Sequence, residues 1–284
     1  MSAHIAPASS VTLTSSAIDT GDMARFFIKL SYRGAAYHGW QRQPGDISVQ
    51  QVVEQALAMV ARTDIAVTGA GRTDAGVNAR LMVAHADIPD DIAVDARFVR
   101  AVNAIVGRDI AIHDVVAVAP DAHARFDAVE RTYHYYVHTS KDPFLQPLSW
   151  QAPPSLDFDA MNEAAALMVG RRDFTSFSKL HTDVKTNICD LRCARWLPLD
   201  GDTPHGCPMA DRYVFVITAD RFLRNMVRAV VGTLVDVGRG KMPPAAVLDI
   251  LERRDRCAAG TSMPGEPLFL WDIKYPYAIC CGGL

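Results

Sequence analysis

The sequence predicts an α+β protein made of two ferredoxin-like lobes, each a split βαβ unit, whose mainly antiparallel sheets join around a central cleft. Two observations lead to this prediction. Segments with strand and helix periodicity follow the order β-α-β-β-α-β in residues 23–120, and the same order returns in residues 121–284. The chain has 284 residues, 49% of them hydrophobic, which is enough to bury a core in each lobe.

The first lobe, residues 23–120, contains two clear helix starts. Ser48 and Gln51 stand in a capping-box pattern, and apolar residues then recur at helical spacing. Asp95 is placed to cap a second helix that runs to Val106. Around these helices the sequence predicts strands at residues 25–31, 65–68, 79–87 and 110–119.

The second lobe, residues 121–284, begins with an alternating strand at 131–139, in which Tyr133, Tyr135 and Val137 share one face. No residue repeat links the two lobes, only the matching order of elements. A groove between two such lobes is a natural substrate site. The further expected elements are strands at 188–197, 212–219 and 268–275 and helices at 158–169, 222–237 and 244–253.

Composition narrows the class of protein. The net charge of −3 argues against a nonspecific polyanion binder, although a local basic surface on an acidic body can still bind nucleic acid. No run of about eighteen apolar residues is present, so no membrane span is predicted. Residues 1–22 are rich in Ser, Thr and Ala without a continuous apolar block, which predicts a disordered tail rather than a signal peptide, and a cytoplasmic protein.

The six cysteines are weak evidence for a metal site. No Cys-x-x-Cys pair occurs, and the only suggestive arrangement places Cys189 and Cys193 before His205 and Cys207. This spacing is loose for zinc. Cysteines on strands are usually small hydrophobic residues in a reducing compartment, so we favour that interpretation and predict no metal.

The densest chemical signal is the loop at residues 69–77, where Arg72 and Asp74 are the large polar side chains among glycines and alanines. Glycine permits sharp turns and close backbone approach at an entropic cost. The loop is neither a P-loop, which needs a Gly-Lys-Ser/Thr ending, nor a dinucleotide fingerprint, which opens a helix. Its structural interpretation is a tight turn with a local Arg72–Asp74 pair.

Asp74 is the leading candidate for a reactive group, because an aspartate can act as a nucleophile or a base. A desolvated carboxylate needs a cationic partner to stay ionised, and Arg72 and Arg228 are the two options. Arg224 and Arg228 lie four residues apart in the helix expected at 222–237 and therefore share a face. The plainer interpretation of that face is a solvated helix surface.

Two segments interleave aromatic rings with basic and polar residues. Tyr133 and Tyr135 alternate on their strand, and such a surface can stack nucleobases, although alternating tyrosines are more often part of a core. Residues 32–43 mix Tyr, His and Trp with Gln and Arg42 before a Pro-Gly turn, which predicts an exposed loop. Neither segment is decisive by itself.

Together, these motifs resemble the TruA family of tRNA pseudouridine synthases. The loop at residues 71–77 is similar to the family's catalytic signature, and further motifs follow in family order over roughly residues 25–275. These further motifs are residues 39–43, 48–50, 123–126, 131–135, 173–177, Phe222 with 226–228 and Gly232, and residues 268–270.

The resemblance implies isomerisation of uridine to pseudouridine at positions 38 to 40 of the tRNA anticodon stem-loop, without a redox, nucleotide or metal cofactor. It implies that Asp74 is the catalytic aspartate, which attacks the nucleotide or removes a sugar proton. It also implies that Tyr133 stacks on the target base and helps to move the C5 proton, while Arg228 pairs with Asp74 and Leu268 lines the pocket. Arg72 would assist extrusion of the target base, which costs about a few kcal/mol.

The predicted substrate-binding set also includes Arg42 and Arg224, because arginine suits recognition of phosphate and bases. The family works as a homodimer whose two clefts share one tRNA, and this assembly is implied here. One position departs from the family pattern, since Asn78 stands where histidine is usual. Both side chains donate hydrogen bonds, so we expect a retained structural role. The alternative functions are a non-catalytic tRNA-binding or RNA-chaperone protein with this fold, and a metal-dependent enzyme that uses the cysteines.

Overall fold

The computed structural model describes residues 22–179, 186–199 and 211–279. The tail expected at residues 1–22 lies outside the described residues apart from Asp22. The first half contains every element that its sequence predicts, and Ser48 and Asp95 cap the two helices by accepting hydrogen bonds from backbone amides. Its elements are β1 (Met23–Tyr32), a 3₁₀ turn (Gly34–Ala36), α1 (Val49–Ala61), β2 (Val67–Gly69), β3 (Asn78–Pro89), α2 (Ala96–Ile105) and β4 (Ile110–Ala117).

The second half also follows the expected order, with two short strands added. These are β6 (Trp150–Gln151) and β7 (Gly170–Asp173), which have too few residues for a periodic pattern. The remaining elements are β5 (Glu130–His138), α3 (Phe158–Met168), a 3₁₀ turn (Thr175–Phe177), β8 (Ile188–Pro198), β9 (Arg212–Ala219), α4 (Met226–Gly238), α5 (Ala246–Arg253), a second 3₁₀ turn (Arg256–Ala258) and β10 (Leu268–Lys274).

One helix boundary differs from the prediction in a way that matters for function. Helix α4 begins at Met226, four residues after the expected start at Phe222. Asn225 has a left-handed backbone (φ +66°), which cannot continue a helix backwards, and Phe222 instead packs edge-on against the Tyr133 ring at 5.1 Å. Arg224 therefore precedes the helix, and the expectation that it shares a helical face with Arg228 is wrong.

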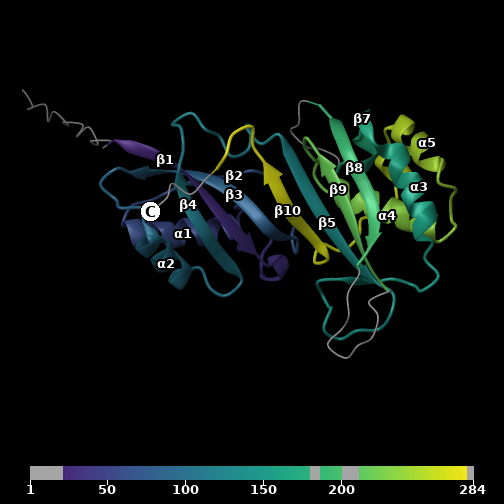
Figure 1. Cartoon of the computed structure of the whole chain (residues 1–284), viewed down its shortest axis with the longest axis horizontal. Helices are drawn as coiled ribbons and strands as arrows, with labels where there is room; N and C mark the ends of the chain where they lie inside the picture. The colour runs from purple at the N-terminus through teal and green to yellow at the C-terminus, as the bar shows by residue number, and fades with distance from the viewer. Residues whose placement is uncertain (1–21, 180–185, 200–210, 280–284) are drawn as a thin grey trace, which may run out of the picture.

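A single sheet joins the two halves. Its strand order is β4-β1-β3-β10-β5-β9-β8-β7, with β2 paired to β3 and β6 to β5. The first half has the order β4-β1-β3-β2 and the second half repeats it as β10-β5-β9-β8, so the predicted α+β class with two split βαβ units is confirmed. The last strand, β10, pairs in parallel with β3 and antiparallel with β5. Figure 1 shows it between the two halves. The division into lobes at residue 120 stays a prediction.

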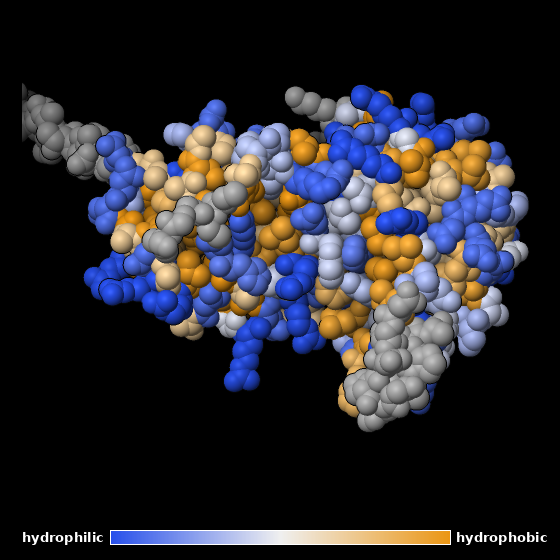
Figure 2. Space-filling model, viewed as in Figure 1, coloured by the Kyte–Doolittle hydropathy of each residue, from blue (hydrophilic) through white to orange (hydrophobic). Residues whose placement is uncertain are grey.

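The helices lie in two groups, one beside each half of the sheet. Figure 1 shows α1 and α2 near β1, β3 and β4, and α3, α4 and α5 near β7, β8 and β9. Helix α4 is apolar almost all round and is correspondingly buried, with Arg228 and Asp236 as its half-buried exceptions. In the view of Figure 2, hydrophobic residues form separate groups with hydrophilic residues between them. No helix of the described segments has the length and apolar character to cross a membrane.

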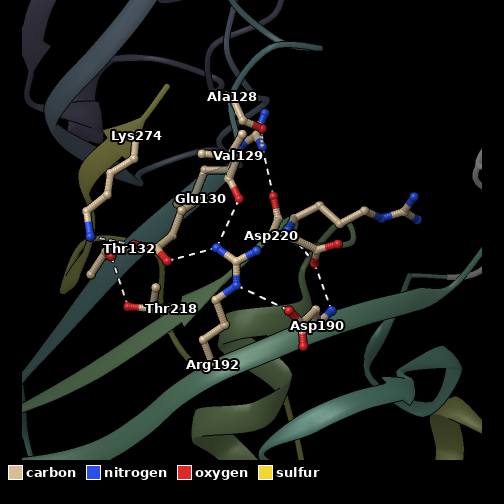
Figure 3. Close-up of polar contacts among 11 residues, drawn as sticks. Ala128, Val129, Glu130, Thr132, Asp190, Arg192, Thr218, Asp220 and Lys274 are labelled. Atoms are coloured by element: carbon tan, nitrogen blue, oxygen red, sulfur yellow. Dashed lines mark hydrogen bonds and ion pairs between the residues drawn. The ribbon is translucent and has the colours of Figure 1, made fainter. Parts of the chain in front are cut away.

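Side chains of β5 divide between the two faces of the sheet. Tyr133 and Tyr135 are buried on one face, as the alternation predicts. On the other face, the Glu130 carboxylate lies 2.9 Å from the Arg192 guanidinium and 2.7 Å from the Lys274 amine, which ties β5 to β8 and β10 (Figure 3). The hydrogen bond from Lys274, with a smaller contribution from Arg192, holds the pKa of Glu130 below its ordinary value. This network links three strands of the sheet on the face opposite Tyr133.

Candidate active site

Asp74 lies in the loop that connects β2 to β3. The loop ends in a β-turn in which the carbonyl oxygen of Asp74 accepts a hydrogen bond from Val77 N at 3.2 Å. Gly76 occupies the third position of this turn with φ +78°, a conformation that turns of type II require and glycine adopts freely. Asp74 is therefore the first residue of a tight turn, which the local sequence favours and which leads into β3.

Neighbouring segments hold this loop by close backbone packing. The amide of Trp40 donates to the Thr73 carbonyl at 3.2 Å, and the Tyr32 hydroxyl bonds the Thr73 hydroxyl at 2.8 Å. A Cβ on Gly69 would lie 2.5 Å from the Trp40 ring, so glycine is required there. The expectation that residues 32–43 form an exposed loop is wrong at two side chains. Tyr32 ends β1 and is 4% exposed, and Trp40 is 3% exposed because Gly69 leaves room for its ring.

The cationic partner of Asp74 is Arg228. Its Nη1 lies 3.4 Å from Oδ2 of Asp74, and both side chains are 23% exposed. Arg72, the other candidate, is exposed, and among the described residues no hydrogen bond or ion pair engages its guanidinium. Arg228 therefore pairs with the carboxylate of Asp74, whereas the guanidinium of Arg72 makes no hydrogen bond or ion pair with a described residue.

The segment that precedes β10 fixes the Arg228 side chain. Its Nε donates to the Met263 carbonyl at 2.5 Å, and the Met263 amide donates back to the Arg228 carbonyl at 3.2 Å. Gly232 permits this approach, because a Cβ there would overlap the Thr261 carbonyl. Arg228 is thus held at both its backbone and its guanidinium before any substrate is present.

Tyr133 completes the cluster from the centre of the sheet. It is 9% exposed, and its ring meets the edge of Phe222. Burial raises the pKa of its phenol, and the Asp74 carboxylate raises it further, whereas Arg131 lowers it. Tyr133 is therefore a neutral phenol at neutral pH, able to donate a hydrogen bond and to present an aromatic face.

Arg131 is a positioning residue that sequence reasoning missed. It lies on the same face of β5 as Tyr133, and its guanidinium donates to four backbone carbonyls. The acceptors are Ala128 at 2.6 Å, Asp220 at 2.8 Å, Ala70 at 3.0 Å and Arg125 at 2.7 Å. A signal was present in the sequence, because the alternation of β5 places this arginine among buried tyrosines, where a charge needs partners. The bond to Ala70 anchors the start of the Asp74 loop.

The structure distributes the other predicted site residues unevenly. Leu268 is 4% exposed and pairs across the sheet with Tyr135, next to Tyr133 on the same strand. Arg42 is exposed in the loop before α1, and its Nη1 lies 3.5 Å from Glu54 of that helix. Arg224 is exposed in the turn before α4.

Asn78 is a buried connector at the start of β3. Its side-chain oxygen accepts a hydrogen bond from Gly34 N at 2.9 Å, and its side-chain nitrogen donates to the Glu266 carbonyl at 2.6 Å. The side chain therefore links the 3₁₀ turn after β1 to the segment before β10. This geometry is the structural role expected of it.

Among the described residues, no group of three or more His, Cys, Asp or Glu side chains is placed to hold a metal ion. His205 and Cys207 of the suggestive sequence arrangement lie outside those residues. Cys189 is buried, and burial raises the pKa of its thiol to about 11, so it is a protonated hydrophobic residue at neutral pH.

Comparison with known proteins decides the family. A family model described as tRNA pseudouridine synthase matches residues 164–276. The tRNA pseudouridine synthase A of Porphyromonas gingivalis is 53% identical over 255 residues, which cover 89% of this chain and 98% of that protein. The chain belongs to the tRNA pseudouridine synthase A family. Its relative of the same name in Parabacteroides distasonis is 52% identical over 254 residues, covering 89% of this chain and 97% of that protein.

More distant members of the tRNA pseudouridine synthase A family match over a similar span. That of Burkholderia mallei is 40% identical over 257 residues, covering 89% of this chain and 90% of its own length. The protein is thus a tRNA pseudouridine synthase, an isomerase that acts on tRNA, as the sequence motifs predict.

Proposed function

We propose that this tRNA pseudouridine synthase isomerises uridine at positions 38–40 of the anticodon stem-loop, with Asp74 as its catalytic residue. The observation that carries the assignment is the ion pair between Asp74 and Arg228 beside the buried phenol of Tyr133. A half-buried carboxylate paired with an arginine whose side chain is fixed by the Met263 carbonyl is suited to act as a nucleophile or a base.

The reaction replaces the bond between C1′ and N1 of uridine by a bond between C1′ and C5. N1 gains a proton and C5 loses one, so no electrons are exchanged with a second reactant. Asp74 attacks the nucleotide or removes a sugar proton to start this exchange, and Arg228 holds its carboxylate in place. Tyr133 stacks on the detached base and helps to move the C5 proton.

The target base must leave its helical stack before Asp74 can reach it. Arg72 is the free arginine of the catalytic loop, and we assign it to the space that the flipped base vacates. Leu268 lines the pocket on the side of β10. Arg42 and Arg224 are exposed and contact the tRNA backbone. The active assembly is a cytoplasmic homodimer that shares one tRNA.

Replacement of Asp74 by asparagine tests the assignment. Asp74→Asn is expected to reduce pseudouridine formation to below about one thousandth of the wild-type rate while tRNA binding survives. Asp236→Asn is the matched control, because Asp236 is also half-exposed in an ion pair, 2.8 Å from Lys241. Activity in Asp74→Asn protein that is free of wild-type enzyme would refute the mechanism.

Pseudouridine mapping on bulk tRNA tests the substrate position. Cells that lack the gene for this chain are expected to lose the signal at positions 38, 39 and 40, and the wild-type gene is expected to restore it. The Asp74→Asn gene is the control and should not restore it. Unchanged signal at all three positions in the deletion strain would overturn the assignment of the anticodon stem-loop.

A further inference from the structure

Phe126 is an exposed aromatic ring next to the active site. It lies in the loop between β4 and β5 and is 75% exposed, which is unusual for a phenylalanine. Phe126 takes no part in the proposed isomerisation. An exposed aromatic ring on a loop joined to a substrate site offers a surface on which a planar ligand can stack.

The ring belongs to a column of aromatic side chains that leads out of the core. His85 is buried, and its ring lies 4.5 Å from that of His123. The His123 ring in turn lies 4.2 Å from the Phe126 ring, inclined by 34°. Phe126 is therefore supported by the inclined His123 ring, which itself packs edge to face with His85, and most of its surface stays exposed.

The backbone of this loop is fixed by its own side chains. Nδ1 of His123 accepts hydrogen bonds from Arg125 N at 3.1 Å and Phe126 N at 3.3 Å. The Tyr275 hydroxyl donates to the Ala124 carbonyl at 2.6 Å. A ring held in this way loses little freedom when a ligand binds, so the platform is preorganised.

The same loop is joined to the catalytic loop. Nη2 of Arg131 donates to the Arg125 carbonyl at 2.7 Å and to the Ala70 carbonyl at 3.0 Å. One guanidinium nitrogen therefore connects the residue before Phe126 with the loop that carries Arg72 and Asp74. Phe126 is therefore carried by a loop that is hydrogen-bonded, through Arg131, to the loop of Asp74.

We propose that Phe126 stacks on an unpaired nucleobase of the bound tRNA, with Arg125 contacting the adjacent phosphate. The Arg125 guanidinium lies 5.7 Å from the centre of the Phe126 ring, and no carboxylate pairs with it among the described residues. An aromatic face beside an unpaired arginine matches a base and its phosphate. The stack anchors the RNA beside the catalytic loop and takes no part in bond making. The proposal needs only that tRNA is the substrate, so it is independent of the role of Asp74.

Product tRNA, which already contains pseudouridine, is the probe for binding because no turnover disturbs the equilibrium. Phe126→Leu, which keeps an apolar side chain but removes the ring, is expected to raise the Kd for product tRNA about 5- to 100-fold. Phe126→Trp is expected to bind as wild type does. The rate of a single turnover at saturating tRNA is expected to stay unchanged in both variants. The weaker binding of Phe126→Leu is expected to appear as a higher KM.

Phe144→Leu is the matched control, because Phe144 is also an exposed phenylalanine, at 93%, on a different loop. Arg125→Gln is expected to lower the slope of log Kd against log salt concentration by about 0.7 to 1, whereas Phe126→Leu leaves the slope unchanged. Wild-type affinity in Phe126→Leu would overturn the proposal. So would a change in oligomeric state with unchanged tRNA affinity per folded molecule, since Phe126 would then belong to a protein interface.

Discussion

The carboxylate of Asp74 and the guanidinium of Arg228 lie 3.4 Å apart, although 154 residues separate them in the chain. Asp74 comes from the loop between β2 and β3, and Arg228 comes from the first turn of α4. The pair therefore forms only when the two halves of the protein are joined, and β10 is the strand that joins them. The Asp74–Arg228 pair therefore depends on the integrity of the central sheet.

Arg228→Lys is expected to lower kcat/KM about 10- to 100-fold. Lysine keeps the positive charge but cannot bond Asp74 and the Met263 carbonyl together, and a hydrogen bond to a charged group contributes about 1.5–3 kcal/mol. Steady-state kinetics on an unmodified tRNA transcript measure the effect. Arg254→Lys, which alters an ion pair with Asp173 away from the site, is the control and should be near wild type. An unaffected Arg228→Lys enzyme would show that Asp74 works without this partner.

Tyr133→Phe is expected to lower kcat about 10²- to 10⁴-fold with KM within about threefold of wild type. The variant keeps the ring that we propose stacks on the base and loses only the phenol that we propose helps to move the C5 proton. Tyr136→Phe removes a phenol from the opposite face of the same strand and should be fully active. A Tyr133→Phe enzyme with wild-type kcat would mean that the phenol takes no part in proton transfer.

Tyr135→Phe is expected to stabilise the protein. Tyr135 is fully buried, and its hydroxyl has no hydrogen-bond partner among the described residues. An unpaired buried hydroxyl costs about 1–3 kcal/mol, so its removal should raise the free energy of unfolding by about 1 kcal/mol. Urea denaturation of the two proteins measures the difference. A loss of stability would instead show that the hydroxyl has a partner in solution.

We expect His85 to cause a decrease in the free energy of unfolding in mild acid. Burial, with the nearby His123 and Arg25 charges, lowers the pKa of His85 from 6.5 to about 4. Between these values the unfolded chain binds the proton and the folded protein does not, so the free energy of unfolding decreases as pH falls from 6.5 to 4. His85→Asn, which keeps an acceptor for Ala124 N, should reduce this loss by about 2 kcal/mol.

Urea denaturation at pH 7 and at pH 4.5 measures this dependence. His113→Asn is the control for the removal of a histidine as such, because His113 is exposed on β4. Parallel pH profiles for wild type and His85→Asn would contradict the prediction, and would show that His85 is protonated to the same extent in both states.

Local signals in the sequence predicted the elements well. Ser48 and Asp95 cap their helices with their own side chains, and the alternation of Tyr133 and Tyr135 is a property of one strand. These signals act over a few residues, so one chain suffices to find them. The start of α4 was missed because Phe222 packs on Tyr133, a contact that no local pattern contains. The four carbonyl acceptors of Arg131 come from four separate backbone positions, and no local pattern predicts this set of contacts either.

The sequence by itself determined the order of strands and helices, the loop that carries Asp74, and, through its motifs, the family of enzyme. Only the tertiary structure decided that β10 lies between β3 and β5 and that Phe126 is displayed on a loop joined to the loop of Asp74, and it placed Arg228 against Asp74, the pair that the motifs imply. The physical reason is the distance along the chain over which each kind of interaction acts. Periodicity and capping depend on neighbours in the chain, whereas ion pairing and burial depend on which distant surfaces pack together.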